Sequence, residues 1–350
     1  MTEASTLPRP AAAQPAADPT IAIVGATGAV GVELIACLER RGFPVGQLKL
    51  LASPRSAGRQ LAFRGAPVAV EPLGPDSFAG TDIAFFSAGA TISRQYAPLA
   101  VAAGATVIDN SSAFRMEPAV PLVVPEVNRG ALASHSGIIA NPNCVAAILT
   151  VALAPLHRAR PIRRLQLATY QAASGAGAAA MEELRLATAA ALDGQAYAPQ
   201  VLPHPYAFNL FSHNAAVDPA TGYNGEELKV VAETRRILGT DTLPIGITCI
   251  RVPVMRAHAI AASVEFDTPL AVEEARALLA QAPGLRLVDD RAGNHFPMPA
   301  EASGADEVLV GRLRRDLGDP SGRTLALFLA GDQLLKGAAL NAVQIAEALR

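Results

Sequence analysis

The 350-residue chain has no tryptophan and only three cysteines, Cys37, Cys144 and Cys249. Three cysteines cannot form a disulfide framework, so their number favours a reducing compartment. No apolar run reaches the roughly 18 residues that a membrane-spanning helix needs. Residues 1–18 are rich in Ala and Pro and lack the apolar core of a signal peptide, and we interpret them as a disordered tail. We therefore expect a cytoplasmic protein.

Charged residues are also scarce, at 17 % of the chain with a formal net charge of −2. This balance gives no electrostatic basis for binding nucleic acid or an anionic membrane. The sequence is 51 % hydrophobic, which suffices for a substantial core, and its length favours two domains. No residue cluster leads us to expect a metal site.

A glycine-rich turn follows the first predicted strand, at residues 21–24. A helix that ends near Arg41 comes next, so the order is strand, turn and helix. This unit is typical of dinucleotide-binding folds, because glycines let the backbone approach a pyrophosphate at the helix N-terminus. The alternative is a plain tight turn. The predicted cofactor contacts here are Gly25, Thr27, Gly28, Ala29, Val30 and Gly31.

The second predicted strand, residues 48–52, ends at Ser53, Arg55 and Ser56. An acid at this point would bind the ribose 2′-hydroxyl of NAD, and none is present. An arginine between two serines suits a 2′-phosphate instead. The sequence predicts NADP(H) over NAD, with an ordinary polar loop as the alternative.

Strands and helices continue to alternate, with strands at residues 82–87 and 105–109 and a helix at 93–103. This rhythm is typical of a parallel sheet, whose ligands bind at the carboxyl ends of the strands. Arg115 follows one of those ends, so it is a candidate anion-binding residue rather than only a solvated charge.

Cys144 lies where the short apolar strand 137–140 gives way to a helix that begins near residue 145. The free N–H groups and dipole of a helix N-terminus favour an anion. We therefore expect this thiol to ionise more readily than an ordinary cysteine and to act as a nucleophile. The alternative is a buried structural cysteine.

The pattern changes after Cys144. Strands are predicted at residues 161–170, 245–254 and 259–266, with a hairpin of 307–315 and 323–330. Helices are predicted at 178–192, 226–238 and 333–349, and the last could pack back on the first domain. The prediction is a Rossmann-type α/β domain followed by an α+β domain with a mostly antiparallel sheet.

Six segments, taken together and in order, resemble the aspartate-semialdehyde dehydrogenase family. They are Gly25–Gly31, Asn110–Arg115, Asn141–Cys144, Tyr170–Gly177, Arg251–Val254 with His258, and Lys336–Asn341. The resemblance covers nearly everything after the tail. It implies a cofactor domain at residues 19–143, completed by 333–350, and a catalytic and dimerisation domain at 144–332, like the C-terminal domain of glyceraldehyde-phosphate dehydrogenase.

The resemblance implies NADPH-dependent reductive dephosphorylation of L-aspartyl 4-phosphate to L-aspartate 4-semialdehyde. This is a step towards lysine, threonine, methionine and diaminopimelate. Cys144 would form a thioester and release phosphate, while His258 would serve as general acid and base. A homodimer is implied, and pairing of dimers into a tetramer stays open.

The resemblance also assigns roles to further residues. Arg251 would bind the substrate carboxylate, Glu226 its amino group, and Gln171 would orient the acyl group. The phosphate would meet Arg115, Asn143 and Lys229, and the cofactor site would include Ser174, Gly175 and Gln333. The alternative for Glu226 and Lys229 is a surface ion pair. Cys37 and Cys249 are interpreted as core residues.

Two positions depart from the family pattern. Alanines occupy 257 and 259, where the family usually has Gly and Ser around the catalytic histidine. The segment 204–206 is also unusual. Two other functions remain open: a reductase of another acyl phosphate or acyl-CoA on the same scaffold, and a catalytically silent paralogue that binds without turning over.

Overall fold

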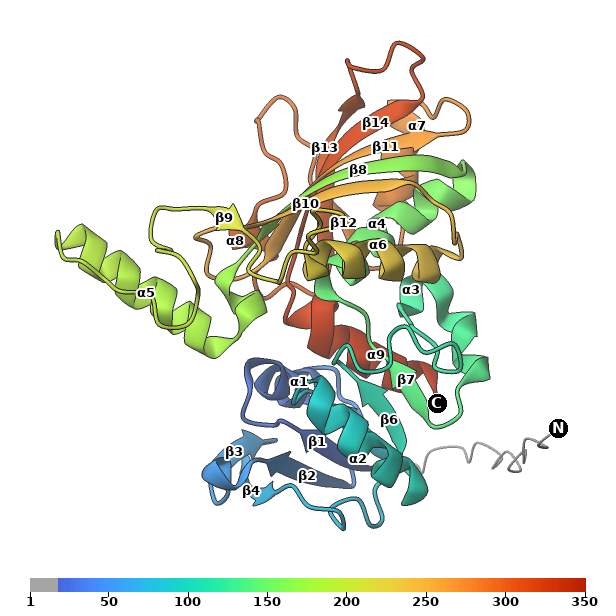
Figure 1. Ribbon diagram of the computed structural model, residues 1–350. Helices are drawn as coiled ribbons and strands as arrows, with labels where there is room; N and C mark the ends of the chain where they lie inside the picture. Colours follow the sequence, from blue (N-terminus) through green and yellow to red (C-terminus); the bar gives the residue numbers. More distant parts are fainter. Residues whose placement is uncertain (1–17) are drawn as a thin grey trace.

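The computed structural model describes residues 18–350, which form two units, each built on a seven-stranded sheet (Figure 1). The predicted tail therefore lies outside the described residues, except for residue 18. The first sheet contains β1 (Thr20–Val24), β2 (Gln47–Ala52), β3 (Gln60–Phe63), β4 (Ala66–Pro72), β5 (Ile83–Phe86), β6 (Thr106–Asp109) and β7 (Ile138–Ala140). Its order is β3-β4-β2-β1-β5-β6-β7, and all pairs except β3–β4 are parallel.

Helices cover both faces of this sheet because its strands are apolar on both sides. One face packs on α1 (Ala29–Arg40), and the other packs on α2 (Ala90–Ala102). The C-terminal helix α9 (Leu340–Ala348) joins the first of these cores, where Leu340, Val343 and Ile345 contact the same cluster as Leu34. The chain thus returns to its first domain at its end, between the two units in Figure 1.

The second sheet is mixed and mostly antiparallel, as predicted. Its strands are β8 (Ile162–Gln171), β9 (Phe211–Ser212), β10 (Ile245–Arg251), β11 (His258–Phe266), β12 (Leu285–Leu287), β13 (Val308–Arg315) and β14 (Thr324–Gly331). The order is β12-β13-β14-β11-β8-β10-β9, in which only β12–β13 and β8–β10 are parallel.

Three helices pack on one face of the second sheet. They are α4 (Cys144–Ala159), α6 (Gly225–Leu238) and α7 (Val272–Gln281). Alternate strand residues such as Leu167, Ile260 and Leu327 point to these helices, while Tyr170 and Phe328 lie on the other face and stay partly exposed. Two short helices, α3 (Pro125–Asn128) and α8 (Pro299–Ala302), lie in connections.

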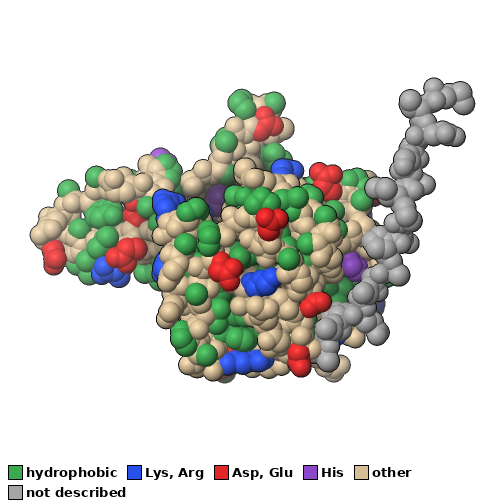
Figure 2. All heavy atoms as spheres, turned by 90° about the horizontal axis from the view of Figure 1, so that it is seen from below, with side chains coloured by type: hydrophobic (Ala, Val, Ile, Leu, Met, Phe, Trp, Pro, Cys, Tyr) green, Lys and Arg blue, Asp and Glu red, His purple; other side chains and the backbone are tan. Residues whose placement is uncertain are grey.

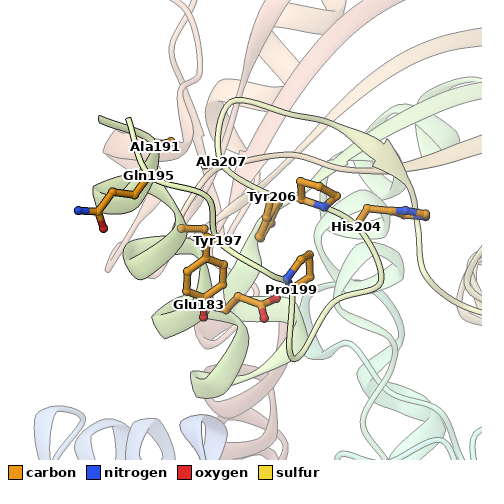
Figure 3. A pocket seen from close by; sticks show the side chains of 10 residues that line it. Glu183, Ala191, Gln195, Tyr197, Pro199, His204, Tyr206 and Ala207 are labelled. Atoms are coloured by element: carbon orange, nitrogen blue, oxygen red, sulfur yellow. The ribbon is translucent and has the colours of Figure 1, made fainter. Parts of the chain in front are cut away.

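Helix α5 (Ala178–Leu192) projects from the body as an arm (Figure 1), and its surface mixes hydrophobic and charged side chains (Figure 2). Between α5 and the following loop lies a hollow of about 130 Å³, lined by Tyr197, His204 and Tyr206 among others (Figure 3). Glu183 fixes this loop by accepting hydrogen bonds from three successive backbone N–H groups, at residues 200–202. None of the predicted site residues lines the hollow.

Several boundaries differ from the predictions. The strand expected at 245–254 ends at Arg251, and the helix expected from residue 93 begins at Ala90. The helix expected over 333–349 opens with a π-helical turn, Leu335–Ala339, before α9. The hairpin β3–β4, α7 and β12 were not predicted from the sequence pattern. Within residues 18–350, no helix is long and apolar enough to cross a membrane.

Candidate active site

Cys144 is the first residue of α4, directly after the turn that follows β7. The Asn143 side chain caps this helix, since its Oδ1 accepts hydrogen bonds from Val145 N–H (2.9 Å) and Ala146 N–H (3.3 Å). The predicted change from strand to helix at Cys144 is therefore confirmed, and the thiol is fixed at the end of the first sheet.

The second sheet brings three predicted residues to one edge. Gln171 and Arg251 pair with each other at the carboxyl ends of the parallel strands β8 and β10. His258 begins the antiparallel strand β11, beside Gln171. Side chains alternate between the two faces of a strand, so the side chains of all three residues point to the sheet face that packs on α4. Cys144 lies on this same side of the sheet.

Glu226 links this edge to the cysteine turn. Its Oε1 accepts hydrogen bonds from Asn143 Nδ2 (2.8 Å) and Gln171 Nε2 (3.2 Å). Burial would raise the pKa of this carboxyl, but the positive charge that His213 carries at acid pH, the hydrogen bond from Asn143 and the charge of Lys229 outweigh burial and hold the pKa below its ordinary value. The site therefore holds a buried, ionised carboxylate.

The prediction that Cys144 ionises readily is wrong for the ligand-free site. Burial, and then the charge of Glu226, raise the pKa of the Cys144 thiol to about 12. Arg115, the Val145 N–H group and Arg251 act in the opposite direction and are outweighed. A helix N-terminus favours the thiolate only modestly, and a neighbouring carboxylate cancels that advantage.

His258 is fully buried and lies in a close-fitting niche. Its Nδ1 accepts a hydrogen bond from Ala172 N–H at 3.0 Å, which leaves Nε2 to carry the proton, and Nε2 has no partner among the described residues. Burial, and then Arg251 and His213, lower the pKa of this imidazole well below its ordinary value. The neutral ring thus presents one free N–H group.

Arg251 is buried and held by residues that sequence analysis missed. Its Nη1 donates to Ala172 O (2.9 Å), while Nη2 lies 2.8 Å from His213 Nε2 and 3.2 Å from Asn214 Oδ1. Burial lowers the pKa of His213 to about 4, so this ring is neutral and can accept from the guanidinium. His213 and Asn214 follow the two-residue strand β9, which is too short to leave a sequence pattern.

Arg115 is also buried, but its guanidinium is bonded to other groups of the protein. It donates to Asn141 O (2.9 Å) and Asn110 O (2.7 Å) and pairs with Glu233 at 3.2 Å. Glu233 was missed as well, although it lies seven residues after Glu226 and so shares its helix face. Lys229 is half-exposed, with its Nζ 3.9 Å from Glu226 Oε2, at the outer edge of the same group.

The predicted cofactor residues of the first domain also meet. Thr27 Oγ1 donates to Ser56 Oγ at 3.3 Å, which joins the glycine turn to the loop of Ser53 and exposed Arg55. Gly25 has φ +86°, and a Cβ there would lie 2.5 Å from Ser87 O. No side chain caps α1, so its first N–H groups suit a pyrophosphate.

Three more predicted cofactor residues surround His258. Gln333 donates to Ser174 Oγ and accepts from Ala257 N–H at 2.9 Å. A Cβ on Gly175 would lie only 2.8 Å from His258 Cε1, so the ring requires a glycine there. Cys37 and Cys249 are fully buried, as predicted. In the described part of the chain, no group of three or more His, Cys, Asp or Glu side chains could hold a metal ion.

Two family models match the chain. Residues 20–135 match the NAD binding domain of semialdehyde dehydrogenase, and residues 153–336 match its dimerisation domain. An aspartate-semialdehyde dehydrogenase of Synechocystis is 52 % identical over 94 % of this chain and 96 % of its own length. The Bacillus subtilis enzyme of the same name is 44 % identical over 94 % of this chain and 97 % of its own.

Comparison with solved structures supports the same family. The Vibrio cholerae aspartate semialdehyde dehydrogenase II complexed with ASA superposes with a TM-score of 0.92 at 41 % identity, covering 95 % of this chain and 98 % of that one. A probable aspartate-semialdehyde dehydrogenase of Pseudomonas aeruginosa gives 0.87 at 34 %, with the same coverage. The chain therefore belongs to the aspartate-semialdehyde dehydrogenase family.

Proposed function

We propose that this protein is an NADPH-dependent enzyme that converts L-aspartyl 4-phosphate to L-aspartate 4-semialdehyde and phosphate, in lysine, threonine, methionine and diaminopimelate biosynthesis. The observation that carries the proposal is the gathering of a cysteine, a histidine, a carboxylate and a guanidinium at one point where the two sheets meet. Membership of the family indicates the substrate on which these groups act. Their hydrogen bonds and charges indicate the chemical role of each group.

The charges of the site suit the charges of the substrate. The buried Arg251 guanidinium would bind the α-carboxylate, and the ionised Glu226 would bind the ammonium group. Lys229, Asn143 and Arg115 are assigned to the phosphate. The guanidinium of Arg115 is already bonded to other residues of the protein. It therefore acts as a buried positive charge beside the site rather than as a guanidinium free to bind phosphate.

Substrate binding would also activate the nucleophile. After burial, the carboxylate of Glu226 is the largest cause of the raised pKa of Cys144, and an ammonium group bound to Glu226 would offset that charge. The thiolate would then attack the acyl carbon, form a C–S bond and release phosphate. Gln171, which donates to Glu226, would keep the acyl group beside the sulfur.

His258 would stabilise the oxygen that gains negative charge in the second step. A bound nicotinamide cofactor supplies hydride chemistry. The Nε2–H group of His258 would donate a hydrogen bond to the oxygen that gains negative charge when the thioester carbon accepts hydride. The C–S bond would then break with its electron pair left on the Cys144 sulfur, which frees the aldehyde and restores the thiolate. Ser174, Gly175 and Gln333, which pack around the ring, would border the nicotinamide.

The choice of NADP(H) over NAD rests on Ser53, Arg55 and Ser56. This loop is joined to the glycine turn by the Thr27–Ser56 hydrogen bond, and Arg55 is exposed for a 2′-phosphate. The turn residues Gly25, Thr27, Gly28, Ala29, Val30 and Gly31 would border the pyrophosphate. Changing Arg55 to Ala should raise the KM for NADP far more than that for NAD.

We also propose the larger organisation. The cofactor domain would comprise residues 19–143 and 333–350, and the catalytic domain residues 144–332. A homodimer would form through the catalytic domain, which matches a dimerisation model. The cysteines of the described chain are all unpaired, which suits the cytoplasm.

The test follows NADPH absorbance in the reverse direction, with aspartate semialdehyde, phosphate and NADP. The wild-type protein should turn over and Cys144→Ala should not, while Cys249→Ala, which changes a buried core cysteine, should keep most of the rate. Turnover of an acyl-CoA instead would favour another acyl substrate. NADP binding without any turnover would favour the silent paralogue.

A further inference from the structure

Three charged side chains join the two domains beside the turn that carries His258. Arg256 Nη1 lies 2.6 Å from Glu33 Oε1, on α1 of the first domain. Arg256 Nε lies 2.6 Å from Asp332 Oδ2, directly after β14. The Asp332 side chain is fully buried and those of Arg256 and Glu33 are 23 % and 19 % exposed, so water weakens these pairs less than surface pairs.

The turn after Arg256 is fixed by the same segment of chain. Ala257 has φ +72°, and its N–H group donates to Gln333 Oε1 at 2.9 Å. His258 pairs with Gly331 across β11 and β14. Asp332 is itself held, since its Oδ2 also accepts from Gly304 N–H (2.7 Å) and its Oδ1 from Leu334 N–H (2.9 Å). A shift of Arg256 therefore moves the backbone that orients His258.

We propose that Arg256 is a positioning residue that fixes His258 and the catalytic domain against helix α1. The inference rests on the proposed function, in which α1 borders the cofactor and His258 serves the reacting oxygen. Hydride transfer needs the reacting carbons of substrate and cofactor in close register, and the pyrophosphate of the cofactor would be held in the other domain, by the turn before α1. Arg256 contacts the cofactor-domain helix with its side chain and lies two residues before His258 in the chain.

The chain offers a matched control in a second ion pair between the same helix and the other domain. Asp306 pairs with Arg40 at 2.5 Å and with Arg41 at 3.6 Å. These side chains are 28–45 % exposed, and Asp306 lies in the connection between α8 and β13, where its ion pairs are with Arg40 and Arg41 and not with the His258 turn. Loss of this pair removes a domain contact without freeing the turn.

The experiment compares Arg256→Gln, Glu33→Gln and the control Asp306→Asn, in the intact protein and the reverse direction. The substrate is aspartate semialdehyde, with hydrogen or deuterium on its aldehyde carbon. We expect Arg256→Gln to lower kcat about tenfold or more, because small misplacements slow a reaction strongly. The deuterium isotope effect on kcat should rise as hydride transfer becomes limiting, with the KM for aspartate semialdehyde nearly unchanged.

Glu33→Gln should change kcat and the isotope effect in the same direction but less, because it leaves the pair of Arg256 with Asp332 in place. Arg256→Lys should recover part of kcat, since an ammonium group reaches one carboxylate. Asp306→Asn should match the wild type in both readouts. The inference would be overturned if Glu33→Gln and Arg256→Gln both kept the wild-type kcat and isotope effect. It would also be overturned if Asp306→Asn lost as much kcat as these two variants.

These outcomes are separate from a failure of the proposed function. If Cys144→Ala or His258→Ala keeps full turnover, the assignment of the reacting groups is wrong, whatever Arg256 does. If both of those variants lose turnover while Arg256→Gln keeps it, only the positioning role is wrong. Glu33→Gln covers the case in which Arg256→Gln fails to fold.

Discussion

Ala257 adopts a backbone conformation that L-amino acids with a side chain rarely adopt. Its φ is +72°, and it is fully buried directly before His258. Such a conformation costs a residue with a Cβ about 1 kcal/mol or more relative to glycine. We therefore expect Ala257→Gly to raise the free energy of unfolding by about 1 kcal/mol with activity retained, as measured by urea unfolding and the reverse assay.

Ala259 provides the control for this substitution. It lies two residues further on, inside β11, where glycine gives only added freedom in the unfolded chain. Ala259→Gly should lower the free energy of unfolding by about 0.5–1 kcal/mol. Equal destabilisation by both glycines would mean that Ala257 is not strained.

The thiol of Cys144 should react slowly with alkylating agents in the ligand-free protein. Its pKa is raised to about 12, so the reactive thiolate is a smaller fraction at neutral pH than in an ordinary cysteine. The thiolate fraction should grow about tenfold per pH unit between pH 7 and pH 10. We expect the iodoacetamide rate at Cys144, followed by mass spectrometry, to rise throughout this range, whereas a plateau below pH 8 would show a lowered pKa.

At the scale of elements, the π-helical turn Leu335–Ala339 packs directly on the start of α4. A Cβ added to Gly337 would lie 2.7 Å from Cys144 Cβ. Gly337→Ala should therefore displace the nucleophile, reduce kcat strongly and lower the free energy of unfolding by about 1–3 kcal/mol. Enzyme assay and urea unfolding measure both effects.

Gly130 supplies the comparison, because a Cβ there would meet nothing within 4 Å and its φ is not positive. Gly130→Ala should leave both kcat and stability near the wild type. If Gly337→Ala behaves in the same way, the π-helical turn does not hold Cys144 in place.

The sequence predicted those elements whose signals are local. The turn at Gly25 follows from glycine chemistry and the helix after Asn143 from an apolar run, and both are observed. The π-helical turn depends on close packing against Cys144, which no periodicity reports. His213 reaches Arg251 only through the pairing of β9 with β10.

The same limit explains the wrong prediction for Cys144. A helix N-terminus is visible in the sequence, so the argument for an easily ionised thiol could be made from position alone. The partial burial of Cys144 and its nearness to Glu226 are set by the docking of α6 beside α4, a contact between distant segments. Residue types and roles could be predicted from pattern and resemblance, whereas their electrostatic balance could not.

At the scale of the whole molecule, one face of the second sheet remains partly exposed. Tyr170 and Phe328 contact there, with ring centroids 6.2 Å apart, on the face away from α4. We expect a homodimer to cover this face. Phe328→Asp should then shift the mass in light scattering towards the monomer, because a carboxylate would be buried unpaired.

Leu99→Asp is the control, because Leu99 is an exposed apolar residue on α2 of the first domain. It should leave the mass unchanged. A dimer that persists in Phe328→Asp would place the interface elsewhere, for example along the α5 arm.

The return of the C-terminal segment to the first domain also bears on synthesis. The core beneath the first sheet includes Leu335, Leu340, Val343 and Ile345, almost the last residues of the chain. Nascent domains usually fold in order as they leave the ribosome. Here part of the interior of the amino-terminal domain stays uncovered until residues 335–345 have left the ribosome, so the middle of the chain can reach its native form before the beginning does.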